Sequence, residues 1–141
     1  AGARVLDLFA GSGQLGIEAL SRGAARCVFI DSSREACAVV RQNLKAAGLF
    51  EKASVAETAA EMYLAACRER FDLVLLDPPY RQGTVAALLP AVAAVTAPGG
   101  TVLAETEHGA PLPERCGTLT LRKQYKYGTV ALARYEADAE F

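Results

Sequence analysis

A chain of 141 residues, 52% apolar and 22% charged, has the length and composition of one folded domain and excludes a disordered segment. Its formal net charge of −1 excludes a broadly basic nucleic-acid-binding protein, so any contact with nucleic acid must come from a local patch. No apolar run approaches the ~20 residues that cross a bilayer, and the first residues read as a core strand, not a signal peptide. We therefore expect one cytoplasmic domain over residues 1–141, without a membrane segment.

The four cysteines lie far apart in the sequence and include no C-x-x-C pair. This spacing argues against a zinc site and against a disulfide scaffold. We expect reduced thiols at Cys27, Cys37, Cys67 and Cys116, and no bound metal.

Segments typical of strands and of helices alternate along the chain. The predicted strands are 4–9, 26–31, 52–57, 71–77 and 101–106, and the predicted helices are 14–23, 32–49, 59–70 and 84–95. Pro90 predicts a kink or a break in the last helix, and residues 97–100 predict a turn. Residues 118–127 and 129–136 both read as strands, with a hairpin signal near Gly128. The expected fold is α/β and Rossmann-like: a mostly parallel sheet with helices on both faces and an antiparallel C-terminal hairpin.

A G-x-G-x-x-G pattern, formed by Gly11, Gly13 and Gly16, joins the first predicted strand to the first helix. Glycine there lets a ligand approach the backbone, and the alternative is a tight turn that needs glycine only for its shape. A dinucleotide would place its pyrophosphate at this helix N-terminus, where the nearby Asp7 carboxylate would repel it. Asp7 instead suits a cationic group such as an α-amine or a sulfonium, and S-adenosylmethionine carries both.

A second acidic residue, Asp31, ends the second predicted strand. At that position a carboxylate accepts hydrogen bonds from the two ribose hydroxyls of an adenosine. Asp31 fits NAD and S-adenosylmethionine equally, and an exposed helix-capping acid is the alternative.

The sequence Asp77-Pro78-Pro79-Tyr80 directly follows the most apolar predicted strand, at the sheet edge where ligands bind in such folds. The two prolines fix the backbone, so that the Asp77 carboxylate and the Pro78 carbonyl become two aimed acceptors. Tyr80 offers an aromatic face on which a base can stack. An exocyclic amine of a nucleobase is a poor nucleophile, and two acceptors on its N–H bonds would direct its lone pair toward an electrophile. The motif therefore predicts methylation of such an amine, with positioning as the main source of catalysis.

The stretches "VLDLFAGSGQLGIEALSRGA" and "FDLVLLDPPYRQG", with "KYG" near the end, resemble the RsmD-like bacterial methyltransferases over nearly the whole chain. That family methylates the N2 amine of a guanine in small-subunit ribosomal RNA and has a seven-stranded sheet with an antiparallel seventh strand. The resemblance implies that Asp77, Pro78, Pro79 and Tyr80 receive the target base. It assigns S-adenosylmethionine to Asp7, Phe9, Ala10, Gly11, Ser12, Gly13, Asp31, Ser32, Glu57, Thr58 and Asp77, with Glu57 and Thr58 beside the adenine.

Three other functions remain open from the residues alone. An adenine-N6 methylase shares the D-P-P-Y motif but usually has a separate target-recognition region. A non-catalytic S-adenosylmethionine-binding module would keep the fold without the reaction. An NAD-dependent oxidoreductase accounts for neither Asp7 nor D-P-P-Y.

The expected partner is ribosomal RNA or a small-subunit assembly particle, and the expected oligomeric state is a monomer. Few basic residues are expected near the active edge: Arg81, Arg122, Lys123 and Lys126. Members of the family usually carry a basic N-terminal extension, and this chain begins almost at its first core strand. We therefore expect it to bind RNA weakly and to methylate it poorly by itself. His108 lies in a Gly/Pro loop, and we expect it to be solvated.

Overall fold

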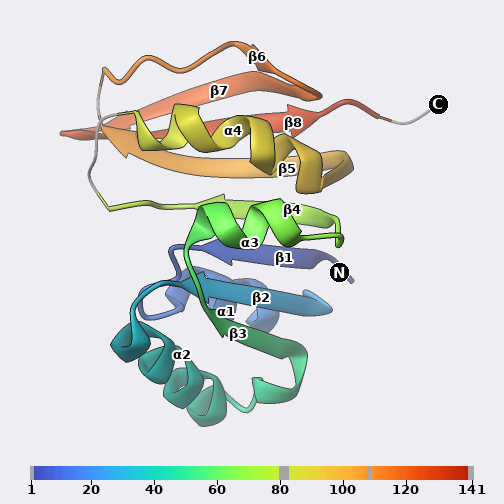
Figure 1. Cartoon of the computed structure of the whole chain (residues 1–141), viewed down its shortest axis with the longest axis vertical. Coiled ribbons are helices and arrows are strands. Elements are labelled where there is room, and N and C mark those ends of the chain that lie inside the picture. Colours follow the sequence, from blue (N-terminus) through green and yellow to red (C-terminus); the bar gives the residue numbers. More distant parts are fainter. Residues whose placement is uncertain (1, 80–82, 108, 140–141) are drawn as a thin grey trace.

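The computed structural model describes residues 2–79, 83–107 and 109–139, so that Tyr80, Arg81 and His108 lie outside the described residues. Within these described ranges, eight strands and four α-helices follow one another in chain order (Figure 1). The strands are β1 (Arg4–Leu8), β2 (Arg26–Asp31), β3 (Ala53–Glu57), β4 (Phe71–Leu76), β5 (Thr96–Glu107), β6 (Arg115–Cys116), β7 (Leu119–Tyr127) and β8 (Val130–Ala137). The helices are α1 (Gln14–Ser21), α2 (Arg34–Ala47), α3 (Ala60–Ala66) and α4 (Thr84–Val95), and a short 3₁₀ turn covers Phe50–Lys52.

All eight strands form one sheet in the order β3-β2-β1-β4-β5-β8-β7-β6 (Figure 1). Strands β1 to β5 pair in parallel, whereas β8 pairs antiparallel with β5 and with β7. The predicted parallel sheet with an antiparallel C-terminal hairpin is confirmed. The sheet has one strand more than the seven expected, because β6 adds a two-residue pairing that is too short to leave a pattern in the sequence.

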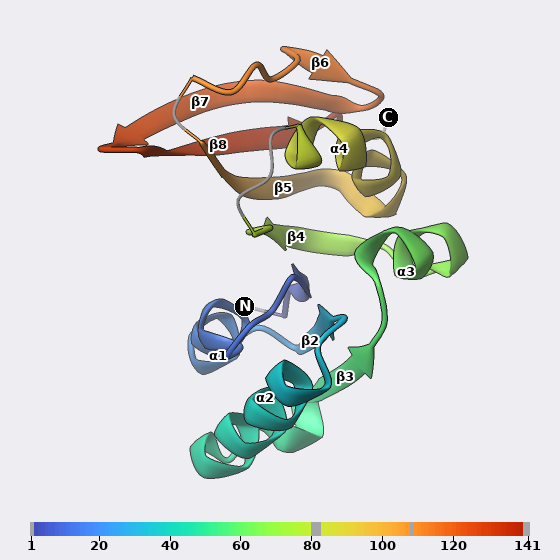
Figure 2. The same cartoon turned by 60° about the vertical axis from the view of Figure 1, so that its left-hand side comes forward.

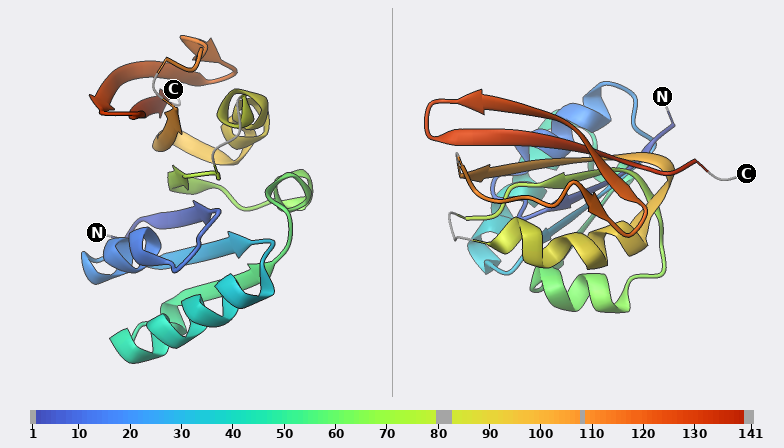
Figure 3. Two further views of the ribbon diagram at one scale, coloured as in Figure 1. Left: turned by 90° about the vertical axis from the view of Figure 1, so that its left-hand side faces the viewer. Right: turned by 90° about the horizontal axis from the view of Figure 1, so that it is seen from above.

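Helices cover both faces of the sheet, as predicted (Figures 2 and 3). On one face, Leu20 of α1 and Val40 and Leu44 of α2 pack with Val5 and Phe29 of the central strands. On the other face, α3 and α4 pack on a larger cluster that includes Leu6, Leu8, Ile30, Leu76 and Tyr135. Strand β1 is buried from Val5 to Leu8 because its alternate residues enter the two cores, which is typical of a central parallel strand.

One predicted feature of the β4–β5 connection was wrong, and one of two alternatives predicted for it is excluded. The predicted turn at residues 97–100 lies inside β5, where the register with β4 shifts between Phe71 and Leu73, so the glycines mark a bulge and not a turn. Of the kink or break predicted at Pro90, the break is excluded, because α4 runs without interruption from Thr84 to Val95. Pro90 is exposed on this helix.

The end of α3 was also predicted too late, at residue 70 instead of Ala66. Cys67 already has an extended backbone conformation. The chain beyond it is held against the sheet by an ion pair of 3.0 Å between Glu69 and Arg26 of β2. All four cysteines are free thiols; Cys27 and Cys37 are buried, and Cys67 and Cys116 are half-buried.

The arrangement of the strands gives the site its position. The order along the chain reverses between β1 and β4, and the carboxyl ends of β1, β2, β4 and β5 meet at one edge. In open α/β sheets such a switch point is where ligands bind. No helix within the described ranges is long and apolar enough to cross a membrane.

Candidate active site

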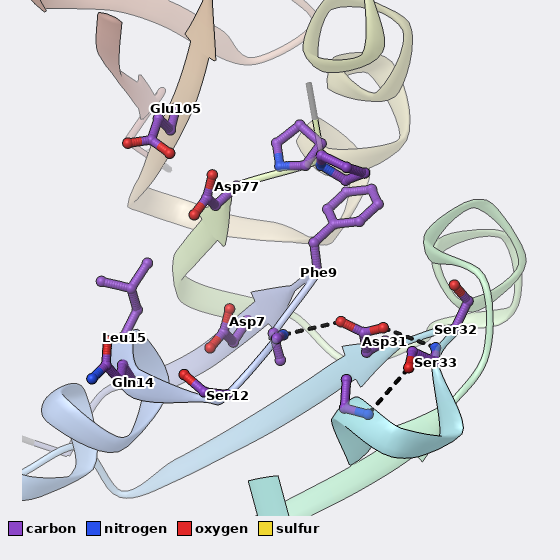
Figure 4. Close-up of a pocket in the computed structure, with 15 residues that line it drawn as sticks. Asp7, Phe9, Ser12, Gln14, Leu15, Asp31, Ser32, Ser33, Asp77 and Glu105 are labelled. Atoms are coloured by element: carbon purple, nitrogen blue, oxygen red, sulfur yellow. Dashed lines mark hydrogen bonds between the residues drawn. The ribbon is translucent and has the colours of Figure 1, made fainter. Parts of the chain in front are cut away.

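A cavity of about 690 Å³ opens at this switch point (Figure 4). Ten of the described residues predicted from the sequence line it: Asp7, Phe9, Ala10, Gly11, Ser12, Asp31, Ser32, Asp77, Pro78 and Pro79. They come from the ends of β1, β2 and β4, which are distant in sequence and adjacent in the sheet. The cavity is also lined by Gln14, Leu15, Ser33, Ala36 and Glu105, which the sequence reasoning had not singled out.

The glycine turn after β1 is tight and open on the ligand side. The Gly13 N–H donates to the Ala10 carbonyl at 2.8 Å, and the Ala10 N–H donates to the Ile30 carbonyl at 2.9 Å. Gly11 has φ +61, and a Cβ added to it would meet no atom within 4 Å. Gly11 therefore offers bare backbone to a ligand in the cavity. Phe9 also has a positive φ, of 62°, which is a strained conformation for a residue with a side chain.

Glycine is needed at position 16 for a different reason than at position 11. A Cβ at Gly16 would lie 2.3 Å from Cε2 of Phe29 and 2.8 Å from Sγ of Cys27. The absence of a side chain thus lets α1 lie directly against β2. The Gly16 N–H also donates to Oδ2 of Asp7 at 3.1 Å, so this close approach fixes the carboxylate orientation.

Asp7 is a buried carboxyl, with 2% of its surface exposed. Its pKa is raised to about 7, mainly by burial and also by the negative charges of Asp77 and Asp31, although the hydrogen bond from Gly16 lowers it. A cationic group in the cavity would offset this cost by stabilising the ionised form.

Asp31 is held by the backbone of two turns. Its Oδ2 accepts from the Gly11 N–H at 3.0 Å, and its Oδ1 accepts from the Ser33 N–H at 2.8 Å (Figure 4). Each carboxylate oxygen has a second lone pair. Asp31 can therefore accept further hydrogen bonds from a pair of hydroxyls in the cavity, such as those of a ribose.

Asp77 directly follows β4, and Glu105 lies near the end of the neighbouring strand β5. Leu76 pairs with Ala104, so the two acidic residues follow at the same level of the sheet, and both line the cavity. Asp77 is open to solvent at the cavity mouth. Even so, partial desolvation by the cavity wall, together with the Glu105 carboxyl, raises the pKa of Asp77 to about 7.

The charge of the cavity discriminates between possible ligands. Four carboxyl groups line it (Asp7, Asp31, Asp77 and Glu105), and the described lining residues include no lysine, arginine or histidine. A pyrophosphate would meet only negative charge, so the geometry tells against the dinucleotide alternative. An adenosine that carries an ammonium or a sulfonium fits this donor set. Within the described ranges, no three His, Cys, Asp or Glu side chains are arranged to hold a metal ion.

Three of the residues assigned by resemblance are not among those that line the cavity. Gly13 precedes α1, and a Cβ on it would lie 3.2 Å from the methyl carbons of Val40. Glu57 pairs with Asp31 across the strands, and the Thr58 N–H donates to the Asp31 carbonyl at 3.0 Å. Glu57 and Thr58 are thus neighbours of Asp31, but they do not line the cavity.

Glu105 is the main residue that the sequence reasoning missed. The signal for it was a carboxylate near the end of a predicted strand, in "TVLAET", which is the same kind of position that Asp31 has at the end of β2. Only the pairing of β5 with β4 shows that Asp77 stands beside it.

Comparison with known proteins tests the resemblance inferred from the motifs. The family model described as Conserved hypothetical protein 95 matches residues 1–136. The chain is 40% identical over 140 residues to YlbH of Bacillus subtilis (strain 168), provisionally described as an rRNA methyltransferase; the match covers 96% of this chain and 76% of the relative. It is 32% identical over 142 residues to ribosomal RNA small subunit methyltransferase D of Escherichia coli (strain K12), covering 98% of this chain and 70% of that protein.

A solved structure agrees with these matches in sequence. A conserved hypothetical protein of Streptococcus pyogenes superposes with a TM-score of 0.90 and 37% identity, covering 97% of this chain and 87% of that one. The resemblance expected from the motifs is confirmed, and the chain belongs to the Conserved hypothetical protein 95 family, which includes ribosomal RNA small subunit methyltransferase D.

Proposed function

We propose that this chain transfers a methyl group from S-adenosylmethionine to the N2 amine of a guanine in small-subunit ribosomal RNA. The observation that carries the proposal is one cavity that joins the carboxylates suited to the cofactor, Asp7 and Asp31, to the Asp77-Pro78 acceptors. Membership of a family with a small-subunit rRNA methyltransferase supports RNA as the substrate.

The cofactor fits the residues of the β1 and β2 turns. Asp31 would accept hydrogen bonds from the ribose hydroxyls, and the bare backbone of Gly11 would leave room for the methionine part. Asp7 would compensate the positive charge. When bound, S-adenosylmethionine supplies a methyl group on a sulfonium, which is already an activated electrophile.

The residues after β4 prepare the nucleophile. The Asp77 carboxylate and the Pro78 carbonyl accept hydrogen bonds from the two N–H groups of the target amine. These two hydrogen bonds direct the lone pair of the amine toward the methyl carbon. As the new N–C bond forms and the S–C bond breaks, the amine becomes acidic and its proton passes to Asp77. A carboxyl with a pKa of about 7 is matched to that task near neutral pH.

The RNA strand itself requires a surface outside this acidic cavity, and β7 offers one. By register, Lys123, Tyr125 and Tyr127 face Arg134, Leu132 and Val130 of β8, and Leu132 in turn faces Glu105. Directly paired residues share a sheet face, so β7 extends the face that carries Glu105. The Lys123 ammonium lies 4.9 Å from the centre of the Tyr125 ring, and Tyr127 is 61% exposed. Stacking platforms for single-stranded RNA combine aromatic and basic side chains in this way.

Of the basic residues expected at the hairpin, Arg122, Lys123 and Lys126 are all exposed on β7. Lys126 faces Ala131, and therefore belongs to the opposite face of the sheet from Lys123.

The partner we propose is ribosomal RNA, either free or in a small-subunit assembly particle. We propose that the chain binds it in the cytoplasm as a monomer.

The test is mass spectrometry of small-subunit rRNA from cells that lack the gene, with and without a plasmid copy. Loss of one N2-methylguanosine that the plasmid restores is the expected result. Loss of an N6-methyladenosine would instead indicate the adenine methylase. An unchanged modification pattern, with S-adenosylmethionine still bound by the purified chain, would indicate a non-catalytic module.

A further inference from the structure

Glu105 is the one carboxylate of the cavity that neither the cofactor nor the methyl transfer employs. It is half-buried and lies at the end of β5, two strands from the cofactor strand β1. Figure 4 shows its carboxylate beside that of Asp77, at the end of the cavity away from Asp31. Glu105 and Asp77 also line a smaller apolar cavity of about 280 Å³ with Leu75, Leu103 and Leu132.

Two neighbouring carboxylates repel each other unless a hydrogen-bond donor or a positive charge lies between them. The described residues that line the cavities around this pair include no basic side chain. Within the described residues, the side-chain partner of Glu105 is the Asp77 carboxyl, whose hydrogen bond with Glu105 helps to raise the pKa of Asp77. The pair thus presents acceptors on neighbouring strands that a ligand with adjacent donors would satisfy.

The three amino-bearing bases differ in the atom that adjoins the amine. In adenine, N6 lies next to the acceptor N1, and in cytosine, N4 lies next to the acceptor N3. In guanine, N2 lies between N3, which is an acceptor, and N1–H, which is a donor that neither of the other bases has beside its amine. A second carboxylate beside the one that holds the amine therefore favours guanine and repels the lone pairs of the other two bases.

We propose that Glu105 selects guanine by accepting a hydrogen bond from N1–H while Asp77 accepts from the N2 amine. The proposal rests on the proposed methyl transfer to N2 and makes Glu105 the specificity-determining residue of that site. It requires an ionised Glu105 when the base is bound, and the guanine donors stabilise both carboxylates. Adenine or cytosine would place a ring-nitrogen acceptor against the Glu105 carboxylate. Burying two acceptors together without a donor between them costs free energy.

The discriminating probe is 2-aminopurine, which keeps the N2 amine but has an acceptor at N1. The target guanine, once located by the mass spectrometry above, is replaced by 2-aminopurine in reconstituted small-subunit particles. Single-turnover methylation is then measured with the wild-type protein and with Glu105→Gln, whose amide can donate to the N1 acceptor. Glu136→Gln removes a carboxylate from β8, outside the cavities described above, and is the matched control.

We expect the wild-type protein to methylate guanine at least tenfold faster than 2-aminopurine. Glu105→Gln should slow guanine by a similar factor and slow 2-aminopurine much less, with unchanged melting temperature and S-adenosylmethionine affinity. If Glu105→Gln slows the methylation of guanine and of 2-aminopurine equally, or slows neither, the role of Glu105 is overturned and the proposed function stands. Methylation of adenine or cytosine by the wild-type protein overturns both proposals together.

Discussion

The Gly11 N–H donates to Oδ2 of Asp31 at 3.0 Å, so the acid at the end of β2 holds the glycine turn that follows β1. The same carboxylate accepts from Ser33 at the start of the α2 turn. Asp31 therefore organises two walls of the cavity before any ligand arrives, and its loss should have more than one effect.

Replacing Asp31 by alanine should weaken S-adenosylmethionine binding by roughly 1–3 kcal/mol, because the ribose hydroxyls and the Gly11 N–H lose their acceptor. Isothermal titration calorimetry measures this directly. Glu61→Ala, which removes an exposed carboxylate from the first turn of α3, is the control. Unchanged affinity in the Asp31 variant would remove that residue from the cofactor site.

Replacing Asp77 by alanine should separate binding from chemistry. Affinity for the cofactor should stay close to that of the wild type, because Asp31 and the glycine turn are intact. Methyl transfer should fall steeply, because the target amine loses an acceptor and its proton loses a base. Single-turnover methylation of small-subunit particles provides the measurement, and a wild-type rate would contradict the mechanism.

The pKa of Asp7 predicts a pH dependence of cofactor binding. The folded carboxyl titrates at about 7, above its ordinary value of 3.8. A cationic ligand favours the ionised form, so affinity should rise between about pH 6 and pH 8, and binding below the pKa should release a proton. Calorimetry in buffers of different ionisation enthalpy detects that proton.

The same group has the opposite effect on the free protein. Since the folded pKa lies above the unfolded one, the contribution of Asp7 to stability is fully present below about pH 4 and is lost as the pH rises through 7. Asp7→Asn should flatten both the binding profile and this part of the unfolding profile. A variant with wild-type profiles would show that another group titrates.

Gly16→Ala tests the contact between α1 and β2. The new Cβ would lie 2.3 Å from the Phe29 ring, so we expect a loss of about 1–3 kcal/mol in the free energy of unfolding. Urea denaturation measures it. Adding Phe29→Leu, which removes the obstructing ring atoms, should recover part of the loss, and simple additivity of the two effects would contradict the proposed clash.

Lys123→Ala tests the RNA surface of β7. Phosphate contacts make affinity depend on salt, so losing one contact should weaken RNA binding and reduce the salt slope by about 0.7 for a single strand. Filter binding to small-subunit rRNA over a range of salt concentrations gives both quantities. Lys52→Ala, an exposed lysine before β3 at the other edge of the sheet, should leave them unchanged.

Most of this site could be predicted because its chemistry is local in the sequence. Asp7 with Gly11, and Asp77 with Pro78, are short runs that follow a recognisable strand, so pattern and position agree. Glu105 could not be found in this way. The place of Glu105 in the site depends on the pairing of β5 with β4. Residues 97–100 were mistaken for a turn because a bulge uses the same glycines as a turn. Strand β6 was missed because two residues have no periodicity.

The pairing of Leu76 with Ala104 has a consequence for how such an enzyme can change over time. The ladder between β4 and β5, and not the chain that connects them, sets the spacing of Asp77 and Glu105. Lengthening a connection costs only about 0.6 kcal/mol for each doubling of a flexible loop. The connection that contains α4 can therefore acquire or lose residues while the two carboxylates keep their places, so descendants of this chain could meet differently shaped RNAs with the same base-reading pair.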